Sequence, residues 1–292
     1  WRHYSSSDVG VETLGVSVGN FSANIDTDGL VLDSCARDSL SPVFIHQQSV
    51  GGNPHAFMRI VDGDSSQTMW QVDVGAIDLE VKATPIIFDV DDDGVLEIII
   101  VYDSNGQATV ELWSPAIECD VTGWKPGGSH ETERLWRWSH STFEMAADKT
   151  CQTCHQPVAQ PLLADLFLDG SPELILAMVD DINDEPNLVA LPLPVSGTPA
   201  PLWEVTLDDG THPSDPVWVQ IDEVSSAILL TTIDENNGEM WIWRVNAATG
   251  QVQYANTLNN LDGDTASPHV RLPGPVITQL DSDPAPEMVV TI

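Results

Sequence analysis

The sequence predicts an all-β fold, a β-propeller built of four-stranded antiparallel blades, on two observations. Short runs rich in Val, Ile, Leu and Trp alternate with turns rich in Asp and Gly, and no run has the period of an amphipathic helix. The same order of four runs also returns along the chain, with anchor residues Asp89, Asp165, Asp222 and Asp281 spaced 76, 57 and 59 residues apart. Four strands per repeat at such a period are typical of propeller blades.

The clearest copy of the repeat lies within residues 84–142. A β-branched run over 84–88 leads into an acidic turn, and a second apolar run over 97–102 follows it. Two further runs, over 108–113 and 134–138, alternate apolar and polar side chains, which is the pattern of strands with one buried face. This copy therefore predicts four consecutive strands.

The other copies account for most of the remaining chain. In chain order we predict an N-terminal segment at 1–40 that contributes to an incomplete blade, blades at 41–78, 84–142, 160–207 and 216–258, a partial blade at 275–292, and an insertion at 139–159. The last copy stops within its second strand. Either the N-terminal segment completes that blade, or the chain is part of a longer polypeptide, and we favour the second.

The run over 85–100, PIIFDVDDDGVLEIII, carries the strongest signature of the repeat. It resembles the FG-GAP/VCBS family of calcium-binding propeller repeats, and the resemblance extends over residues 40–292. This resemblance implies a propeller whose acidic turns bind calcium.

The acidic turn of this run has carboxylates at positions 1, 3, 5 and 9 and a glycine at position 6, which suits a hard cation in a tight loop. The predicted ligands are the side chains of Asp89, Asp91 and Asp93, the backbone carbonyl of Val95 and the carboxylate of Glu97. The four carboxylates among these ligands, within nine residues, would repel one another without a cation. The alternative is an Asp-rich β-turn held by side-chain to backbone hydrogen bonds, with no metal.

Two further turns keep part of this pattern and are weaker candidates for calcium. The acidic residues that they retain are Asp165, Asp169 and Glu173 in the third full blade and Asp281, Asp283 and Glu287 in the partial blade. Phe167 replaces the position-3 carboxylate in the former. The turn that begins at Asp222 is so degenerate that we predict a purely structural role for it.

A Cys-x-x-Cys-His motif, Cys151 to His155, falls in the predicted insertion. Its spacing fits a c-type haem attachment site, in which Cys151 and Cys154 bind the porphyrin and His155 binds the iron, with His140 as the preferred distal ligand. A local disulfide between the two cysteines fits the same residues. So does a structural zinc site that adds His140 as its fourth ligand. The sequence leaves these three interpretations open, as it does the pairing of Cys35 with Cys119.

The net charge of −35, from 45 acidic and 10 basic residues, excludes several classes of partner. Such a surface repels nucleic acid phosphates and anionic lipids, and no apolar run reaches the roughly 18 to 20 residues that would span a bilayer. It is suited to a salty or calcium-rich exterior, so we predict an extracellular, cell-surface or periplasmic location. The chain begins at Trp1, and we expect a processed or excised segment.

The sequence therefore predicts a calcium-braced, non-enzymatic module for binding or assembly within a larger surface or secreted protein or polymer. Its partners would be other such proteins or glycans. The second hypothesis is an electron-transfer protein with one c-type haem and a redox partner. The third is a carbohydrate-active enzyme, for which Trp241 and Trp243, on one side of a predicted strand, would form a sugar platform; packing between blades is the alternative role for this pair.

Overall fold

The computed structural model is all-β, as predicted, and the part of the chain that it describes contains strands and turns but no helix, hence no helix that could span a membrane. The described residues are 13–19, 21, 40–51, 53–64, 66–76, 80–81, 83–93, 95–104, 107–115, 119–120, 123–124, 133–141, 143–144, 159–180, 185–207, 212–234, 239–258, 274–278 and 287–289. Two compact units divide the chain: unit 1 comprises Trp1–Asn105, Thr109–Ser139 and Pro194–Thr198, and unit 2 the rest.

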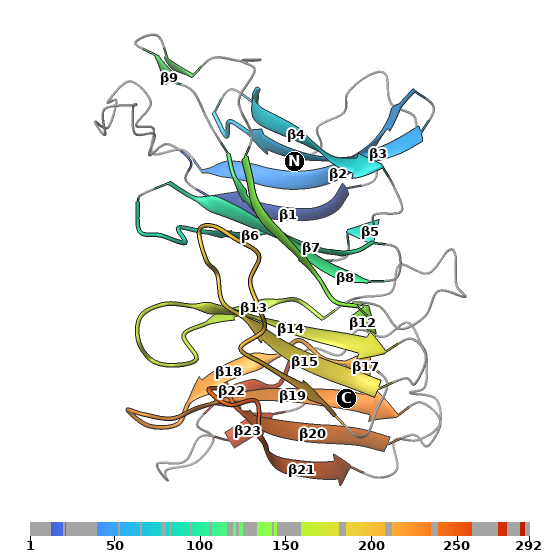
Figure 1. The fold of residues 1–292 in the computed structure, drawn as a ribbon, viewed down its shortest axis with the longest axis vertical. Helices are drawn as coiled ribbons and strands as arrows, with labels where there is room; N and C mark the ends of the chain where they lie inside the picture. The colour runs from blue at the N-terminus through green and yellow to red at the C-terminus, as the bar shows by residue number, and fades with distance from the viewer. Residues whose placement is uncertain are drawn as a thin grey trace. The chain divides into compact units, whose positions relative to one another are not determined.

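The first sheet of unit 1 is an antiparallel meander of four strands in chain order (Figure 1). Its strands are β1 (Thr13–Gly19), β2 (Ser41–Val50), β3 (Asn53–Val61) and β4 (Thr68–Ala76). The last three coincide with apolar runs of the first predicted blade. β1 comes from the predicted N-terminal segment, and it pairs with β2 from Thr13 opposite His46 to Gly19 opposite Ser41.

The second sheet of unit 1 is also four strands wide, with the order β11-β8-β7 and an edge position shared by β5 and β6. Its strands are β5 (Glu80–Val81), β6 (Ile86–Phe88), β7 (Glu97–Asp103), β8 (Ala108–Ser114) and β11 (Glu133–Ser139). A small hairpin of β9 (Cys119–Asp120) and β10 (Gly123–Trp124) lies between β8 and β11 in the chain.

Unit 2 contains two sheets of the same width. The third sheet holds β12 (Phe143–Glu144), β13 (Leu162–Ala164), β14 (Glu173–Asp180), β15 (Glu185–Leu191) and β16 (Trp203–Thr206). The fourth holds β17 (His212–Pro213), β18 (Val217–Gln220), β19 (Ser226–Asp234), β20 (Glu239–Asn246) and β21 (Val252–Leu258). A two-stranded sheet follows, made of β22 (Val276–Thr278) and β23 (Glu287–Val289). The four-stranded antiparallel blade predicted from the repeat is thus confirmed.

The first strand of the second, third and fourth sheets, which lies at one edge of the sheet, is split into two short pieces. In each case both pieces pair with the same edge of the next strand, β7, β14 or β19. The residues between the pieces are 82–85, 145–161 and 214–216. β12 therefore belongs to the third sheet, although the sequence analysis placed it in the insertion at 139–159.

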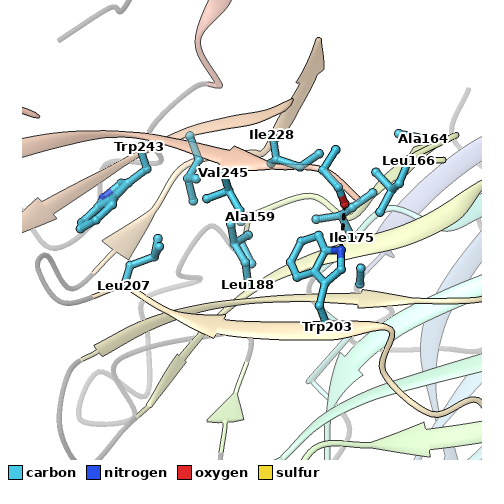
Figure 2. Close-up of a cluster of buried hydrophobic side chains, with 14 residues drawn as sticks. Ala159, Ala164, Leu166, Ile175, Leu188, Trp203, Leu207, Ile228, Trp243 and Val245 are labelled. Carbon is cyan, nitrogen blue, oxygen red and sulfur yellow. Dashed lines mark hydrogen bonds between the residues drawn. The ribbon is translucent and has the colours of Figure 1, made fainter. Parts of the chain in front are cut away.

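Each unit buries its own apolar core between its two large sheets. The core of unit 1 joins side chains of β2 to β4 with Ile98, Ile100 and Trp113 of the second sheet. The core of unit 2 joins Ile175 and Leu188 of the third sheet with residues of the fourth (Figure 2). The strand that follows each described acidic turn is mostly buried, and β7 is buried throughout. Each of these turns therefore ends at a strand that is held by the core.

Trp203, the first residue of β16, joins the third and fourth sheets. Its indole N–H donates a 2.8 Å hydrogen bond to the carbonyl of Ala247, which Figure 2 shows as a dashed line. Gly250 has a φ of +70°, and a Cβ there would lie 2.8 Å from the Trp203 ring. Only glycine suits this close approach without strain.

Trp241 and Trp243 on β20 lie with their ring centroids 5.7 Å apart in a stacked arrangement. Trp243 is buried and donates its indole N–H to Thr232, and Trp241 packs against the same core. The pair therefore has the packing role that was one of its two predicted roles.

Candidate metal loop and its second copy

The loop from Asp89 to Leu96 connects β6 to β7, and the pairing of these strands brings its ends together. Phe88 at the end of β6 lies directly opposite Glu97 at the start of β7. Because paired residues of antiparallel strands are about 5 Å apart, this register holds Asp89 close to Glu97. The turn between them contains Asp92 with a φ of +57°, a left-handed conformation that Asp tolerates better than most residues.

Three of the predicted ligands come together in this loop. Asp89, Asp91 and Glu97 can each direct a carboxylate oxygen so that the three oxygens lie within 4.8 Å of one another. Glu97 is buried, Asp89 half-buried and Asp91 exposed, so the group opens to solvent on one side. Such an arrangement of oxygens could hold a hard cation such as calcium.

Backbone N–H groups fix the shape of the loop without any ion. Glu97 accepts a 2.9 Å hydrogen bond from Val90 N–H, and Asp89 accepts one of 3.2 Å from Asp93 N–H. Asp93 accepts a 2.7 Å bond from Val95 N–H and is not part of the three-carboxylate group. The alternative predicted for this turn, side chains bonded to the backbone, is therefore present alongside the carboxylate group.

Burial and mutual repulsion raise the pKa of two carboxyl groups in this loop. Burial raises the pKa of Glu97 to about 7, and Asp91, Asp93 and Asp89 add to the rise while the Val90 N–H opposes it. Burial, followed by the charge of Asp93, also raises the pKa of Asp91. A bound cation would reverse both effects, since it favours the ionised carboxylates. The residues present thus fit a calcium ion.

The loop from Asp165 to Pro172 repeats this geometry between β13 and β14. Leu166 N–H donates 2.9 Å to Glu173, Asp169 N–H donates 3.0 Å to Asp165, and Ser171 N–H donates 2.9 Å to Asp169. These bonds have the same sequence spacing as those of the first loop. Leu168, at the position of Asp92, has the same φ of +57°.

The second loop lacks the third carboxylate of the first. Phe167 occupies the position of Asp91, with 44% of its surface exposed. Within the residues that the structure describes, Asp165, Asp169 and Glu173 do not form a group of the kind found in the first loop. Burial still raises the pKa of Glu173, with smaller contributions from Asp169 and Asp165.

The remaining acidic turns differ from these two. Asp222 accepts a 2.9 Å bond from Val224 N–H, and the Ser225 side chain and this N–H lower its pKa, as expected of a self-contained structural turn. Ser226 lies at the position of Glu97 and Glu173, opposite the last residue of β18. Asp281 and Asp283 lie outside the described residues, and Glu287 is described only as the first residue of β23.

The Cys151, Cys154 and His155 motif lies outside the described residues, so its three interpretations stay predictions. Its place in the chain is nevertheless fixed, because residues 145–161 separate β12 from β13. His140, the proposed distal ligand, has its Nε2 3.2 Å from a carboxylate oxygen of Glu204, which also accepts a bond from Asn187. Nothing in the sequence pattern relates His140 to Glu204, which lies 64 residues away.

The sequence analysis also missed a buried acidic residue in the second sheet. Glu111 is fully buried and forms ion pairs with Arg134 and Arg137. A signal for it was present: an acidic residue interrupts an apolar run, and two of the chain's ten basic residues follow on one strand.

Comparisons with known proteins give no family. No family model and no curated protein matches the chain. Among solved structures, the V. cholerae biofilm matrix protein Bap1 is 14% identical with a TM-score of 0.40, over 91% of this chain and 41% of that one. The Bacillus licheniformis rhamnogalacturonan lyase PL11 is 12% identical with a TM-score of 0.42, over 96% and 55%.

The exotype rhamnogalacturonan lyase YesX is likewise 12% identical with a TM-score of 0.42, over 93% of this chain and 52% of that one. The chain thus spans 41% to 55% of the lengths of these three proteins.

Proposed function

We propose that this chain is a calcium-braced propeller module that acts outside the cytoplasm in binding or assembly and carries out no catalysis. The observation that carries the calcium part is the approach of three carboxylate oxygens of Asp89, Asp91 and Glu97 to within 4.8 Å. The resemblance of residues 85–100 to FG-GAP/VCBS repeats supports it, as does the net charge of −35, which extracellular cations would screen.

Calcium in this loop would be structural. Asp89, Asp91 and Glu97 would bind it with carboxylate oxygens, and Val95 would add its backbone carbonyl. The ion would connect β6 to β7 and neutralise the charges that now repel. An ion that binds only the folded chain stabilises it by about 2.7 kcal/mol when its free concentration is a hundredfold above Kd.

Thermal unfolding in calcium and in EGTA tests this role, with Asp91→Asn as the variant and Asp92→Asn as its control. The control removes one charge from the same loop, at a residue outside the carboxylate group, and Asn tolerates the φ of +57°. We expect calcium to raise the midpoint of the wild type and of Asp92→Asn. Asp91→Asn should lose most of the shift and at least about tenfold in calcium affinity, or 1.4 kcal/mol.

A wild-type midpoint that is the same in calcium and EGTA would contradict the proposal, as would a full shift in Asp91→Asn. The absence of catalysis is tested separately, by incubating the calcium-loaded protein with acidic and neutral polysaccharides. The appearance of new reducing or unsaturated ends would replace the binding role with an enzymatic one.

The Cys151 to His155 motif favours a second candidate, in which this chain also carries one c-type haem and transfers electrons. Such a haem would supply a one-electron redox centre in the segment between β12 and β13. A Soret band and a haem adduct on the peptide that contains both cysteines are expected if it is present. A native sample without either would remove this candidate.

A further inference from the structure

Four side chains form a charged network on one face of the second sheet. Arg134 lies opposite Trp113, and Arg137 opposite Glu111, across the pairing of β11 with β8. Trp113 belongs to the core of unit 1, so this face of the sheet is covered near its centre. The two arginine side chains are 44% and 41% exposed, while that of Glu111 is fully buried. The guanidinium groups therefore lie at the border between core and solvent.

Both oxygens of Glu111 are already used inside the network. Oε1 accepts a 2.8 Å bond from Arg134 Nη1 and lies 3.9 Å from Arg137 Nε. Oε2 accepts a 3.0 Å bond from the indole N–H of Trp113. One arginine would be enough to neutralise this buried carboxylate. The second leaves the cluster with a local charge of +1.

The two guanidinium groups are held in place before any ligand binds. Arg134 lies over the Trp113 ring at 5.9 Å from its centroid, and Arg137 Nη2 is within 3.4 Å of Ser104 Oγ. A guanidinium has five N–H donors in a planar fork, and the bonds above use few of them. Among the described residues, N–H donors thus remain unused on both half-exposed groups.

We propose that Arg134 and Arg137 bind the carboxylate of an acidic sugar. A carboxylate is planar and accepts paired N–H bonds from guanidinium forks. As a monoanion it also neutralises the local charge of +1, whereas a phosphate dianion would overcompensate it. A net charge of −35 repels polyanions of high charge density, and a glycan with one carboxylate per sugar is repelled less than a polyphosphate. The proposal names a ligand for the binding module proposed above and rests on that role.

Isothermal titration with trigalacturonate tests the site, with neutral maltotriose and inorganic phosphate as comparison ligands. Calcium binds uronates directly, so the titrations are made in EGTA, below the unfolding midpoint of the metal-free protein. The variant is Arg137→Gln, because it leaves the 2.8 Å pair of Arg134 with Glu111 intact. Arg59→Gln is its control: Arg59 is a basic residue of the first sheet that bonds to Gln71 at 2.8 Å.

We expect trigalacturonate to bind the wild type at least about tenfold more tightly than maltotriose does, since charge-assisted hydrogen bonds carry the contact. Arg137→Gln should lose about tenfold in affinity, and Arg59→Gln less than about threefold. Equal losses in the two variants, equal binding of maltotriose, or no binding by the wild type would overturn the proposal. Tighter binding of inorganic phosphate than of trigalacturonate would show that the arginine pair binds phosphate groups, and would overturn the proposal as well.

Asp91→Asn separates this proposal from the calcium role. This variant keeps both arginines, so it should bind trigalacturonate like the wild type even though calcium no longer stabilises it. Loss of carboxylate binding in Asp91→Asn, measured in the same EGTA buffer, would show that the loop at 89–97 takes part in the contact, and would overturn the assignment to Arg134 and Arg137 alone.

Discussion

The loops at 89–97 and 165–173 have the same backbone hydrogen bonds and the same left-handed residue, but only the first gathers three carboxylates. In both loops the last Glu accepts the N–H of the residue that follows the first Asp. The shape of the turn is therefore set by these hydrogen bonds and needs no ion. One position, Asp91 in the first loop and Phe167 in the second, distinguishes a turn that gathers three carboxylates from a turn that does not.

The largest expected effect is the pH dependence that the first loop gives to the unfolding free energy of the metal-free protein. The folded pKa of Glu97 is raised to about 7, above its ordinary value of 4.5. A raised carboxyl pKa means that stability is fully present below pH 4.5 and is lost as the pH rises through about 7. In EGTA, urea unfolding should show a loss of up to about 3 kcal/mol from Glu97 between pH 5 and pH 8.

Glu97→Gln should remove most of this slope, whereas the control Asp92→Asn should keep it. Glu173 contributes a slope of the same sign in the second loop, where two aspartates act on it instead of three. If Glu173→Gln flattened the profile more than Glu97→Gln, the burial of Glu97 and the three aspartates around it would not be the main cause of the slope.

The next largest effect on the unfolding free energy is expected when each of the two glutamates is removed as a hydrogen-bond acceptor. Glu173→Ala leaves the Leu166 N–H without its acceptor in a buried place, which should cost about 2 kcal/mol in unfolding free energy at pH 5.5. Glu97→Ala should cost less, since the Val90 N–H is only partly buried. Urea unfolding of both variants measures the difference, and Glu173→Gln serves as a control that keeps an acceptor oxygen. A larger cost for Glu97→Ala would contradict this ranking.

The smallest effect on stability, and the sharpest test of the comparison, is expected from Phe167→Asp. Phe167 is 44% exposed, so its replacement should change the stability in EGTA by no more than about 0.5 kcal/mol. In calcium, isothermal titration should show one site more than in the wild type. Phe167→Ser should leave the stoichiometry of the wild type unchanged. No additional site in Phe167→Asp would mean that the second loop differs from the first in more than this residue.

Much of the fold could be predicted because its signals are local. Alternating side chains located β8 and β11, and the spacing of Asp89 and Glu97 located the acidic turn. β12 escaped prediction because two residues, Phe143 and Glu144, are too few to show a period. Pairings across long stretches of chain, such as His140 with Glu204, could not be predicted at all, since they depend on which strands become neighbours.

The split edge strand described above has a consequence for how such sheets acquire new segments. Because both pieces pair with one edge of the next strand, the residues between them can lengthen without shifting the register of the sheet. Going from four residues, at 82–85, to 17, at 145–161, costs about 1.3 kcal/mol in loop-closure entropy. The gap at 214–216 is different, because Ser214 is buried and its Oγ accepts the N–H of Thr231, while Asp215 accepts the N–H of Gln160. A peptide inserted there would break these contacts.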